Sequence, residues 1–378
     1  MKQRVRITFG DMRIGEVARG LIDDALNRNW ITEGLNVKKF EDEFCEKFGY
    51  KYSVAMSSGT MADIAACLSL YEYGAVSGDE VIIPALSFGS LANSVLAAGL
   101  KPVFVDCKID TLNMDEDKIE RAITPRTKAI MVVHTLGKPC DMKKIQPIAW
   151  RFNLKLIEDC AEAHGAQFDG VTVGHFGNMG TFSFYVAHPI VAGEGGMVVT
   201  NDDKMAHILR SVKNHGRPFG SIHFDFQRLG LNMRMNDLTA AVGVESLRNF
   251  DDIFEKRRQN WLYLTKLVSP LTKYCYFVHE GPNELMCSFA FTLVLKEYRY
   301  DLQALYKYLE DNGIQCKRIF GCLPTQHQAF KFLGYKPGQF TNAEYVGING
   351  LHFGIHQYLN DSDMEFIAEN LFEYFKGK

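Results

Sequence analysis

Long apolar runs are missing from this chain of 378 residues. No stretch reaches the roughly 20 consecutive apolar residues that a membrane-spanning helix needs. The opening residues Met-Lys-Gln-Arg-Val-Arg are not followed by an apolar segment either, so we expect no secretory signal peptide. The sequence therefore predicts a protein without a membrane partner.

Closely spaced cysteines are missing as well. The nine cysteines are scattered, and no two of them form a Cys-x-Cys or Cys-x-x-Cys pair. An odd number of isolated thiols argues against a disulfide framework and against a zinc site. We expect reduced, mostly buried cysteines, no bound metal and a cytoplasmic location.

An excess of one charge is also lacking. The chain has 42 lysines and arginines against 45 aspartates and glutamates, and its net charge is −3. No basic stripe indicates nucleic acid as a partner, and no acidic tail indicates disorder. With 47% hydrophobic residues, the composition is that of an ordinary globular enzyme.

Short apolar runs alternate with helical patterns over the first two thirds of the chain. This alternation predicts a doubly wound, mostly parallel sheet covered by helices on both faces. A long helix is expected over Leu247–Leu267, followed by a smaller α+β region. We therefore expect two domains, residues 1–250 and residues 251–378. The strands expected in the larger domain are Tyr52–Met56, Glu80–Ile83, Pro102–Asp106, Ala129–His134, Lys155–Glu158 and Met197–Thr200; in the smaller domain we expect strands at Ser288–Leu295 and Gln315–Ile319 and helices at Leu302–Asn312 and from Asp361.

Small polar residues follow the first expected strand, at Ser57-Ser58-Gly59-Thr60. Ligands of open α/β sheets lie beyond the carboxyl ends of the strands. The free backbone amides and the helix dipole at that point favour a phosphate group. An ordinary helix cap explains the same residues.

Two acids, Glu158 and Asp159, stand at the end of a buried strand. A buried acid costs free energy unless a partner compensates it, and a protonated pyridine nitrogen is one such partner. A structural acid that caps the next turn is the alternative.

A single histidine, His188, follows Ser183-Phe184-Tyr185 and precedes the glycine-rich turn Gly193-Glu194-Gly195-Gly196. A lone histidine is more often structural than catalytic. Its place among the other segments favours a functional role here.

Together these segments resemble the DegT/DnrJ/EryC1/StrS sugar aminotransferase family over nearly the whole chain. The resemblance implies a fold-type I transferase fold that uses pyridoxal or pyridoxamine phosphate. The matching segments are Ser57–Thr60, Pro84–Phe88, Phe104–Asp106, Glu158–Ala166, Ser183–Tyr185, Gly193–Gly196, Asn214–Gly216 and Leu231–Asn236.

The resemblance also implies roles for individual residues. Gly59, Thr60 and Ser183 should bind the cofactor phosphate, Asp159 should face the pyridine nitrogen, and Phe88 should stack on the ring. Asn232 should reach the cofactor of a neighbouring subunit, which implies a homodimer with shared active sites.

His188 departs from the family pattern, because the aminotransferases carry at this position the lysine that binds the cofactor covalently. Imidazole cannot form a stable imine, but it can move a proton near neutral pH. Two groups of sugar 3-dehydratases in the family share this change. One acts on CDP-linked sugars with an iron–sulphur cluster, and the cysteines for that cluster are missing after Val198.

The other group acts on GDP-4-keto-6-deoxymannose without a cluster. Two features favour it: Glu162 stands where aminotransferases usually have glutamine, and the segment Asn349–Gln357 resembles its closing motif. His215 and His356 lie in matching segments, where they either contact the sugar or are structural.

The sequence thus predicts removal of the C3 hydroxyl from a nucleotide-linked 4-keto-6-deoxy sugar, with L-glutamate regenerating pyridoxamine phosphate. An aminotransferase that tolerates histidine and a catalytically silent binding protein are the alternatives. GDP is favoured over CDP, and hexose and heptose both remain open.

Overall fold

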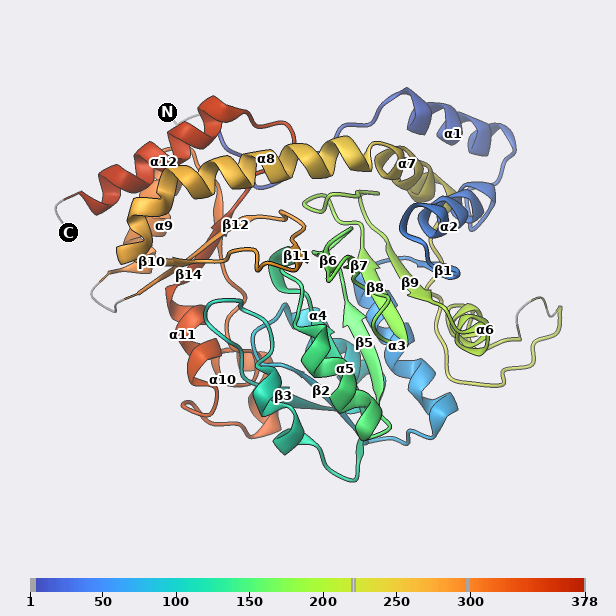
Figure 1. Ribbon diagram of the computed structural model, residues 1–378. Coiled ribbons are helices and arrows are strands. Elements are labelled where there is room, and N and C mark those ends of the chain that lie inside the picture. The colour runs from blue at the N-terminus through green and yellow to red at the C-terminus, as the bar shows by residue number, and fades with distance from the viewer. Residues whose placement is uncertain (1–4, 219, 221, 297–299, 377–378) are drawn as a thin grey trace.

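A seven-stranded sheet forms the centre of the larger part of the chain (Figure 1). The computed structural model describes residues 5–218, 220, 222–296 and 300–376. The strand order is β1-β9-β8-β5-β4-β2-β3, and β9 runs antiparallel to the six other strands. The mostly parallel sheet expected from the sequence is therefore confirmed. The strands are β1 Tyr52–Met56, β2 Glu80–Pro84, β3 Lys101–Val105, β4 Thr127–Val133, β5 Lys155–Asp159, β8 Met179–Ser183 and β9 Gly196–Thr200.

Helices cover both faces of this sheet, because its strands are apolar on both sides. Along β2, Val81 and Ile83 pack into the core beneath α3, α4 and α6, whereas Ile82 packs into the core beneath α5. α2 and α7 cover the remaining strands on the α5 side. The helices of this part are α1 Glu16–Asn27, α2 Leu35–Phe48, α3 Gly59–Ser69, α4 Gly89–Ala97, α5 Met142–Arg151, α6 Asp203–Val212 and α7 Asp237–Arg248.

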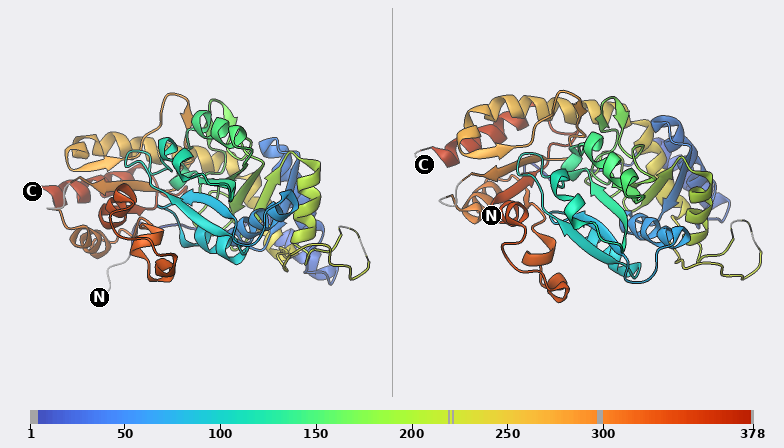
Figure 2. Two further views of the ribbon diagram at one scale, coloured as in Figure 1. Left: turned by 90° about the horizontal axis from the view of Figure 1, so that it is seen from below. Right: turned by 60° about the horizontal axis from the view of Figure 1, so that its bottom comes forward.

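The smaller part is built on a four-stranded antiparallel sheet of order β10-β12-β14-β13. Helix α8 runs along both parts in all views (Figure 1, Figure 2), and α12 packs against it. None of the described helices is long and apolar enough to span a membrane. The elements are α8 Phe250–Val268, β10 Cys275–Phe277, β12 Phe291–Leu295, α9 Leu302–Asp311, β13 Cys316–Arg318, α10 Leu323–Gln326, α11 Thr341–Asn349, β14 Gly350–Phe353 and α12 Asp361–Phe375.

A short ribbon and several single turns complete the described structure. The ribbon has the order β11-β6-β7 and joins the two parts. These elements are β6 Gln167–Phe168, β7 Val171–Thr172, β11 Glu284–Leu285, and the 3-10 helices Leu70–Tyr73, Glu116–Lys118, Glu120–Ala122, Thr135–Gly137, Ser269–Lys273 and Gln328–Leu333.

Several details differ from the sequence prediction, and strands β10 and β14 were not expected. The long helix predicted over Leu247–Leu267 is present as α8, but its predicted start is wrong: α7 ends at Arg248, Asn249 leaves the helical conformation, and α8 begins at Phe250. Strand β8 was not predicted, because Gly180 and the hydroxyl residues beside it interrupt the apolar pattern. We propose to keep the domain division at residue 250, where the two helices meet.

The N-terminal segment lies against the smaller part. Ile7 pairs with Ile314, and Arg6 donates a hydrogen bond to Asp363 at 3.0 Å. Residues 6–9, which the proposed division assigns to the larger domain, are thus held by the smaller one.

Candidate active site

The carboxyl ends of β1, β5 and β8 meet at one edge of the large sheet, as the parallel topology requires. α3 begins at Gly59, and the Ser58 hydroxyl accepts a hydrogen bond from the Met61 amide at 3.2 Å. Ser58 is therefore an N-cap. The cap alone does not explain the glycine beside it.

Gly59 is required by the close approach of two strand ends. A Cβ atom at Gly59 would lie 2.6 Å from the Cβ of Ser183, and one at Gly196 would lie 2.2 Å from the carbonyl oxygen of Ser58. Only glycine fits at such distances. The helix N-terminus, Thr60 and Ser183 thus come together, and this arrangement can hold a phosphate group.

Glu158 and Asp159 point to opposite faces of β5 and have different surroundings. Glu158 is fully buried and accepts hydrogen bonds from the amides of Gly174 and Gly177 at 2.8 and 2.6 Å, and from His134 Nε2 at 3.1 Å. The Cys140 amide donates to His134 Nδ1 at 3.0 Å, so the ring hydrogen is on Nε2. Glu158 is a structural acid.

Asp159 faces the site instead. It accepts one hydrogen bond, from the Ala161 amide at 2.9 Å, which agrees with the alternative of a turn cap. Burial raises the pKa of Asp159 to about 6. A cation placed beside this carboxyl group would lower its pKa again and favour the ionised form. Asp159 therefore fits the protonated pyridine nitrogen of the expected cofactor.

A second buried carboxyl group, Asp63 on α3, lies close to Asp159. Thr181 donates a hydrogen bond to it at 2.7 Å, and burial together with the charge of Asp159 raises the pKa of Asp63 well above its usual range. The sequence analysis did not find Asp63. The signal was available as an acid within the apolar run of α3.

His134, Glu158 and Cys160 could in principle hold a metal ion, because their ligand atoms lie within 4.8 Å of one another. The hydrogen bonds of His134 and Glu158 already account for both side chains. We therefore assign no metal ion to these three residues.

His188 lies beyond the end of β8, with only 7% of its surface exposed. Its ring lies 5.3 Å from the ring of Phe289 and 5.7 Å from that of His164. Its Nδ1 atom is buried without a hydrogen-bond partner within the described residues. Burial, assisted by the charges of Arg257 and Lys317, lowers the pKa of His188 to about 3. At neutral pH the imidazole is therefore uncharged, and a pKa this low makes it a weak base until an anionic group lies beside it.

Arg257 on α8 holds the backbone that carries this histidine. It is 1% exposed and donates hydrogen bonds to the carbonyl oxygens of Ala187 at 3.2 Å and Phe289 at 3.2 Å, and to Gln357 Oε1 at 2.9 Å. Burial lowers the pKa of Arg257 to about 10. All these acceptors are neutral, which is costly for a buried cation. The sequence analysis missed Arg257, although it falls on the apolar stripe of α8.

Glu162 accepts a hydrogen bond from the Leu136 amide at 2.7 Å. Burial raises the pKa of Glu162 to about 8, with a contribution from Asp159. The carboxyl group is therefore mostly protonated at pH 7. In that state it can both donate and accept, like the glutamine that the aminotransferases usually have here.

Phe88 and Asn232 are exposed. Phe88 follows β2, has 66% of its surface exposed and lies 6.1 Å from the ring of Phe320. An apolar ring left open beyond a strand end agrees with stacking on a ligand. Asn232 precedes Met233, whose carbonyl oxygen accepts a hydrogen bond from the Ser57 amide at 2.7 Å.

The two predicted sugar-contacting histidines differ in their surroundings. His215 is exposed and has a positive φ of 60°. His356 is buried, its Nδ1 accepts from the Tyr358 amide at 3.4 Å, and its Nε2 donates to the Thr8 hydroxyl at 2.9 Å. Both ring nitrogens of His356 are thus used within the chain, which favours its structural alternative.

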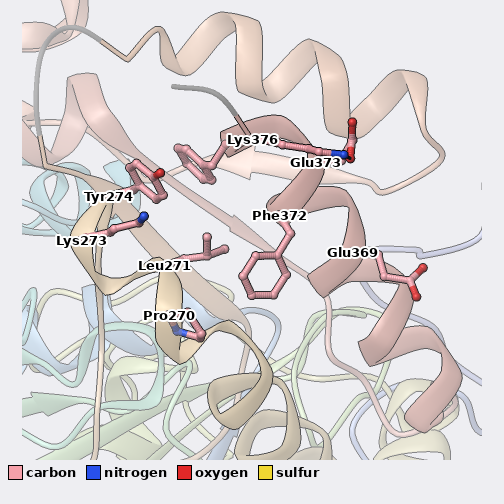
Figure 3. A pocket seen from close by; sticks show the side chains of 9 residues that line it. Pro270, Leu271, Lys273, Tyr274, Glu369, Phe372, Glu373 and Lys376 are labelled. Atoms are coloured by element: carbon pink, nitrogen blue, oxygen red, sulfur yellow. Dashed lines mark hydrogen bonds and ion pairs between the residues drawn. The ribbon is translucent and has the colours of Figure 1, made fainter.

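An open hollow of about 550 Å³ lies elsewhere, between the Ser269–Lys273 turn and α12 (Figure 3). Leu271, Tyr274, Phe372 and Glu373 are among the residues that line it. None of the predicted site residues is among them. The hollow is therefore separate from the strand ends.

Known proteins resemble this chain over nearly its whole length. The model of the DegT/DnrJ/EryC1/StrS aminotransferase family matches residues 13–372. A GDP-4-keto-6-deoxy-D-mannose 3-dehydratase from Yersinia pseudotuberculosis is 34% identical over 378 residues, which are 94% of each chain. A GDP-perosamine synthase from Escherichia coli O157:H7 is 32% identical over 360 residues, which are 94% of this chain and 95% of that one.

A crystal structure of GDP-4-keto-6-deoxymannose-3-dehydratase with a trapped PLP-glutamate geminal diamine is also similar. Its TM-score is 0.89 at 29% identity, with 97% of this chain and 100% of that chain covered. This likeness confirms the predicted fold-type I transferase fold.

Proposed function

Because this chain belongs to the DegT/DnrJ/EryC1/StrS aminotransferase family, we propose that it is a cofactor-dependent sugar-nucleotide 3-dehydratase. It is an enzyme of the pyridoxal-phosphate-dependent, sugar-modifying type. The proposed reaction removes the C3 hydroxyl of a nucleotide-linked 4-keto-6-deoxy sugar. One observation carries the proposal: a buried, uncharged imidazole, His188, stands where a lysine would bind the cofactor.

The residues at the strand ends fit pyridoxamine or pyridoxal phosphate. When bound, the cofactor supplies an amine for the sugar ketone and a ring that stores electrons. Gly59, Thr60 and Ser183 would hold its phosphate, and Asp159 would keep its ring nitrogen protonated. Phe88 would cover the ring, and Glu162 would donate a hydrogen bond to it.

His188 would move the protons. Its neutral ring nitrogen would accept a proton from the carbon next to the cofactor amine. The resulting imidazolium would donate a proton to the departing C3 hydroxyl, which would leave as water. L-glutamate is the proposed amine donor for the return half of the cycle, and the relative trapped with glutamate supports it.

A nucleotide-sugar aminotransferase is the second candidate, because the GDP-perosamine synthase is nearly as similar as the 3-dehydratase. A lysine would bind the cofactor covalently and would favour return of the amine to the sugar. Histidine cannot do so, which favours dehydration. A catalytically silent protein would not need the contact between Gly59 and Ser183 or the buried Asp159.

Product analysis separates these candidates. Incubation with L-glutamate and a panel of GDP- and CDP-linked 4-keto sugars, hexoses and heptoses, is read by mass spectrometry. We expect a sugar nucleotide lighter by one oxygen atom, together with ammonia and 2-oxoglutarate. The His188→Asn variant is the control for background reaction. A 4-amino sugar as the main product would instead support the aminotransferase.

We also propose a homodimer with shared active sites. Next to Asn232, large apolar side chains face solvent in the single chain: Ile222 is 86% exposed, Phe224 79% and Leu229 63%. The segment that holds them extends from the body of the chain in both views of Figure 2. Exposed apolar groups of this size are typical of an interface, and a second copy would place Asn232 near the partner's cofactor.

Mixing two inactive variants tests the shared site. His188→Asn and Asn232→Ala are each expected to be inactive as pure dimers. In a mixed dimer, one of the two sites retains both native residues, so part of the activity should return. Product formation is measured after subunit exchange has been verified with differently tagged chains. Exchange without recovery would show that Asn232 does not act across the interface.

A cytoplasmic location and a part in deoxysugar and polysaccharide biosynthesis complete the proposal. All nine cysteines are free thiols, and eight of them are buried. A reducing compartment agrees with that state.

A further inference from the structure

A series of rings leads from His188 into the smaller part of the chain. The ring of Phe289 lies 5.3 Å from that of His188, the ring of Phe9 lies 6.2 Å from that of Phe289, and the ring of His352 lies 5.1 Å from that of Phe9. Phe320 is 6.0 Å from His352 on another side. The ring of His352 is thus connected to that of His188 through the rings of Phe9 and Phe289.

Lys317 stands beside this histidine. In the small sheet, Lys317 on β13 pairs directly with His352 on β14, and directly paired residues point to the same face. The ammonium group of Lys317 lies 4.1 Å from the centre of the Phe9 ring. Lys317 and His352 thus flank Phe9 on one side of the site.

Both groups lack a polar partner within the described residues. His352 is 2% exposed, and its Nδ1 atom is buried without a hydrogen bond. Lys317 is exposed and forms no ion pair with a described carboxylate.

Burial adds to the cost of leaving the His352 ring nitrogen unpaired, whereas Lys317 is exposed and only partly desolvated. Desolvation lowers the pKa of Lys317, and burial together with the charge of Lys317 lowers the pKa of His352 to about 3. A buried polar atom left unpaired costs about 1–3 kcal/mol. A ligand oxygen between the two side chains would remove that cost.

We propose that Lys317 and His352 form a subsite for an anionic oxygen, of carboxylate or phosphate class, on a substrate of this enzyme. The ammonium group supplies the charge, and the neutral imidazole supplies one directed N–H group. The inference rests on the proposed function, because its two candidate ligands are the substrates of the proposed reaction. These are the carboxylates of L-glutamate and the diphosphate of the nucleotide sugar.

The test uses Lys317→Met in the cofactor-loaded full chain. The first arm measures the glutamate dependence of cofactor amination by absorbance, without any sugar. The second arm measures the binding of GDP and CDP by calorimetry. We expect the apparent affinity for one ligand class to fall by about tenfold or more, because a charge-assisted hydrogen bond is lost. A lower affinity for glutamate would show that the subsite binds a carboxylate. A lower affinity for the nucleotides would show that it binds a phosphate.

Arg318→Met is the matched control, since it removes the same charge one residue along, and neighbouring side chains on a strand point to opposite faces. Lys317→Arg should restore most of the lost affinity. His352→Gln should weaken the same arm as Lys317→Met, and thermal unfolding verifies that each variant is folded. Unchanged affinities in both arms, or equal losses in Lys317→Met and Arg318→Met, would overturn the subsite.

Failure of the subsite can be distinguished from failure of the proposed function. Glutamate-driven amination and nucleotide binding are common to dehydratases and aminotransferases. Both arms therefore give a result even if product analysis shows an amino sugar.

Discussion

Replacing His188 with asparagine is expected to lower the rate of C3 dehydration by about 10²–10⁴-fold, the usual contribution of a general base. The imidazole is buried and uncharged at neutral pH, and an anionic group of the cofactor or substrate beside it would raise its pKa toward the range of an effective base. Asparagine keeps a polar group of similar size but has no basic nitrogen. Release of ammonia and of the deoxy sugar is followed over time, with cofactor content determined for both proteins.

His188→Lys provides the opposite test at the same position. A lysine there should bind the cofactor covalently, so that borohydride fixes it to the chain, whereas the unmodified protein should retain none after the same treatment. Dehydration should also fall, because the amine is no longer free as a base, and some 4-amino sugar could be formed. Undiminished dehydration in both His188 variants would show that another group is the base.

The second large effect is expected from Glu158→Gln, as a loss of stability. Two of the three donors to this carboxylate, the Gly174 amide and His134 Nε2, share one oxygen; the amide oxygen can serve both, but the amide nitrogen then faces the Gly177 amide and cannot accept from it. His134 cannot change its tautomer, because the Cys140 amide occupies Nδ1. The free energy of unfolding should fall by about 3 kcal/mol or more, as measured by urea denaturation.

Asp159→Asn is the matched control, one residue along the same strand. In the folded chain, burial raises the pKa of Asp159 from 3.8 to about 6. The ionised form therefore reduces stability as the pH rises through this interval. Without cofactor, the variant should be as stable as the unmodified protein or more so above pH 6, but it should lose the cofactor on dialysis. Equal destabilisation by both substitutions would contradict the separate roles of the two acids.

Local sequence patterns located much of the fold. β1 has the bounds that were predicted, and β2 extends one residue beyond its prediction. The strand-end position of Ser57–Thr60 also followed from local signals, because turn residues between an apolar strand and a helix are readable without tertiary information. Two adjoining helices were harder to separate, since Asn249 interrupts the helix without disturbing the apolar spacing.

Contacts between distant segments could not be predicted in the same way. The approach of Gly59 to Ser183 depends on the order of the strands in the sheet. The partners of Arg257 come from three separate segments, and the pairing of Lys317 with His352 is a matter of register between two short strands. Such features follow from packing, which local periodicity does not report.

The hydrogen bonds of Arg257 connect the chemistry of the site to movement of the whole molecule. One guanidinium group joins the segment that carries His188, the connection into the small sheet at Phe289, and the segment after β14 at Gln357. If the two sheets rotate relative to each other, at least one of these bonds must lengthen. Opening the enzyme to exchange ligands and keeping its base aligned are therefore competing demands on a single side chain.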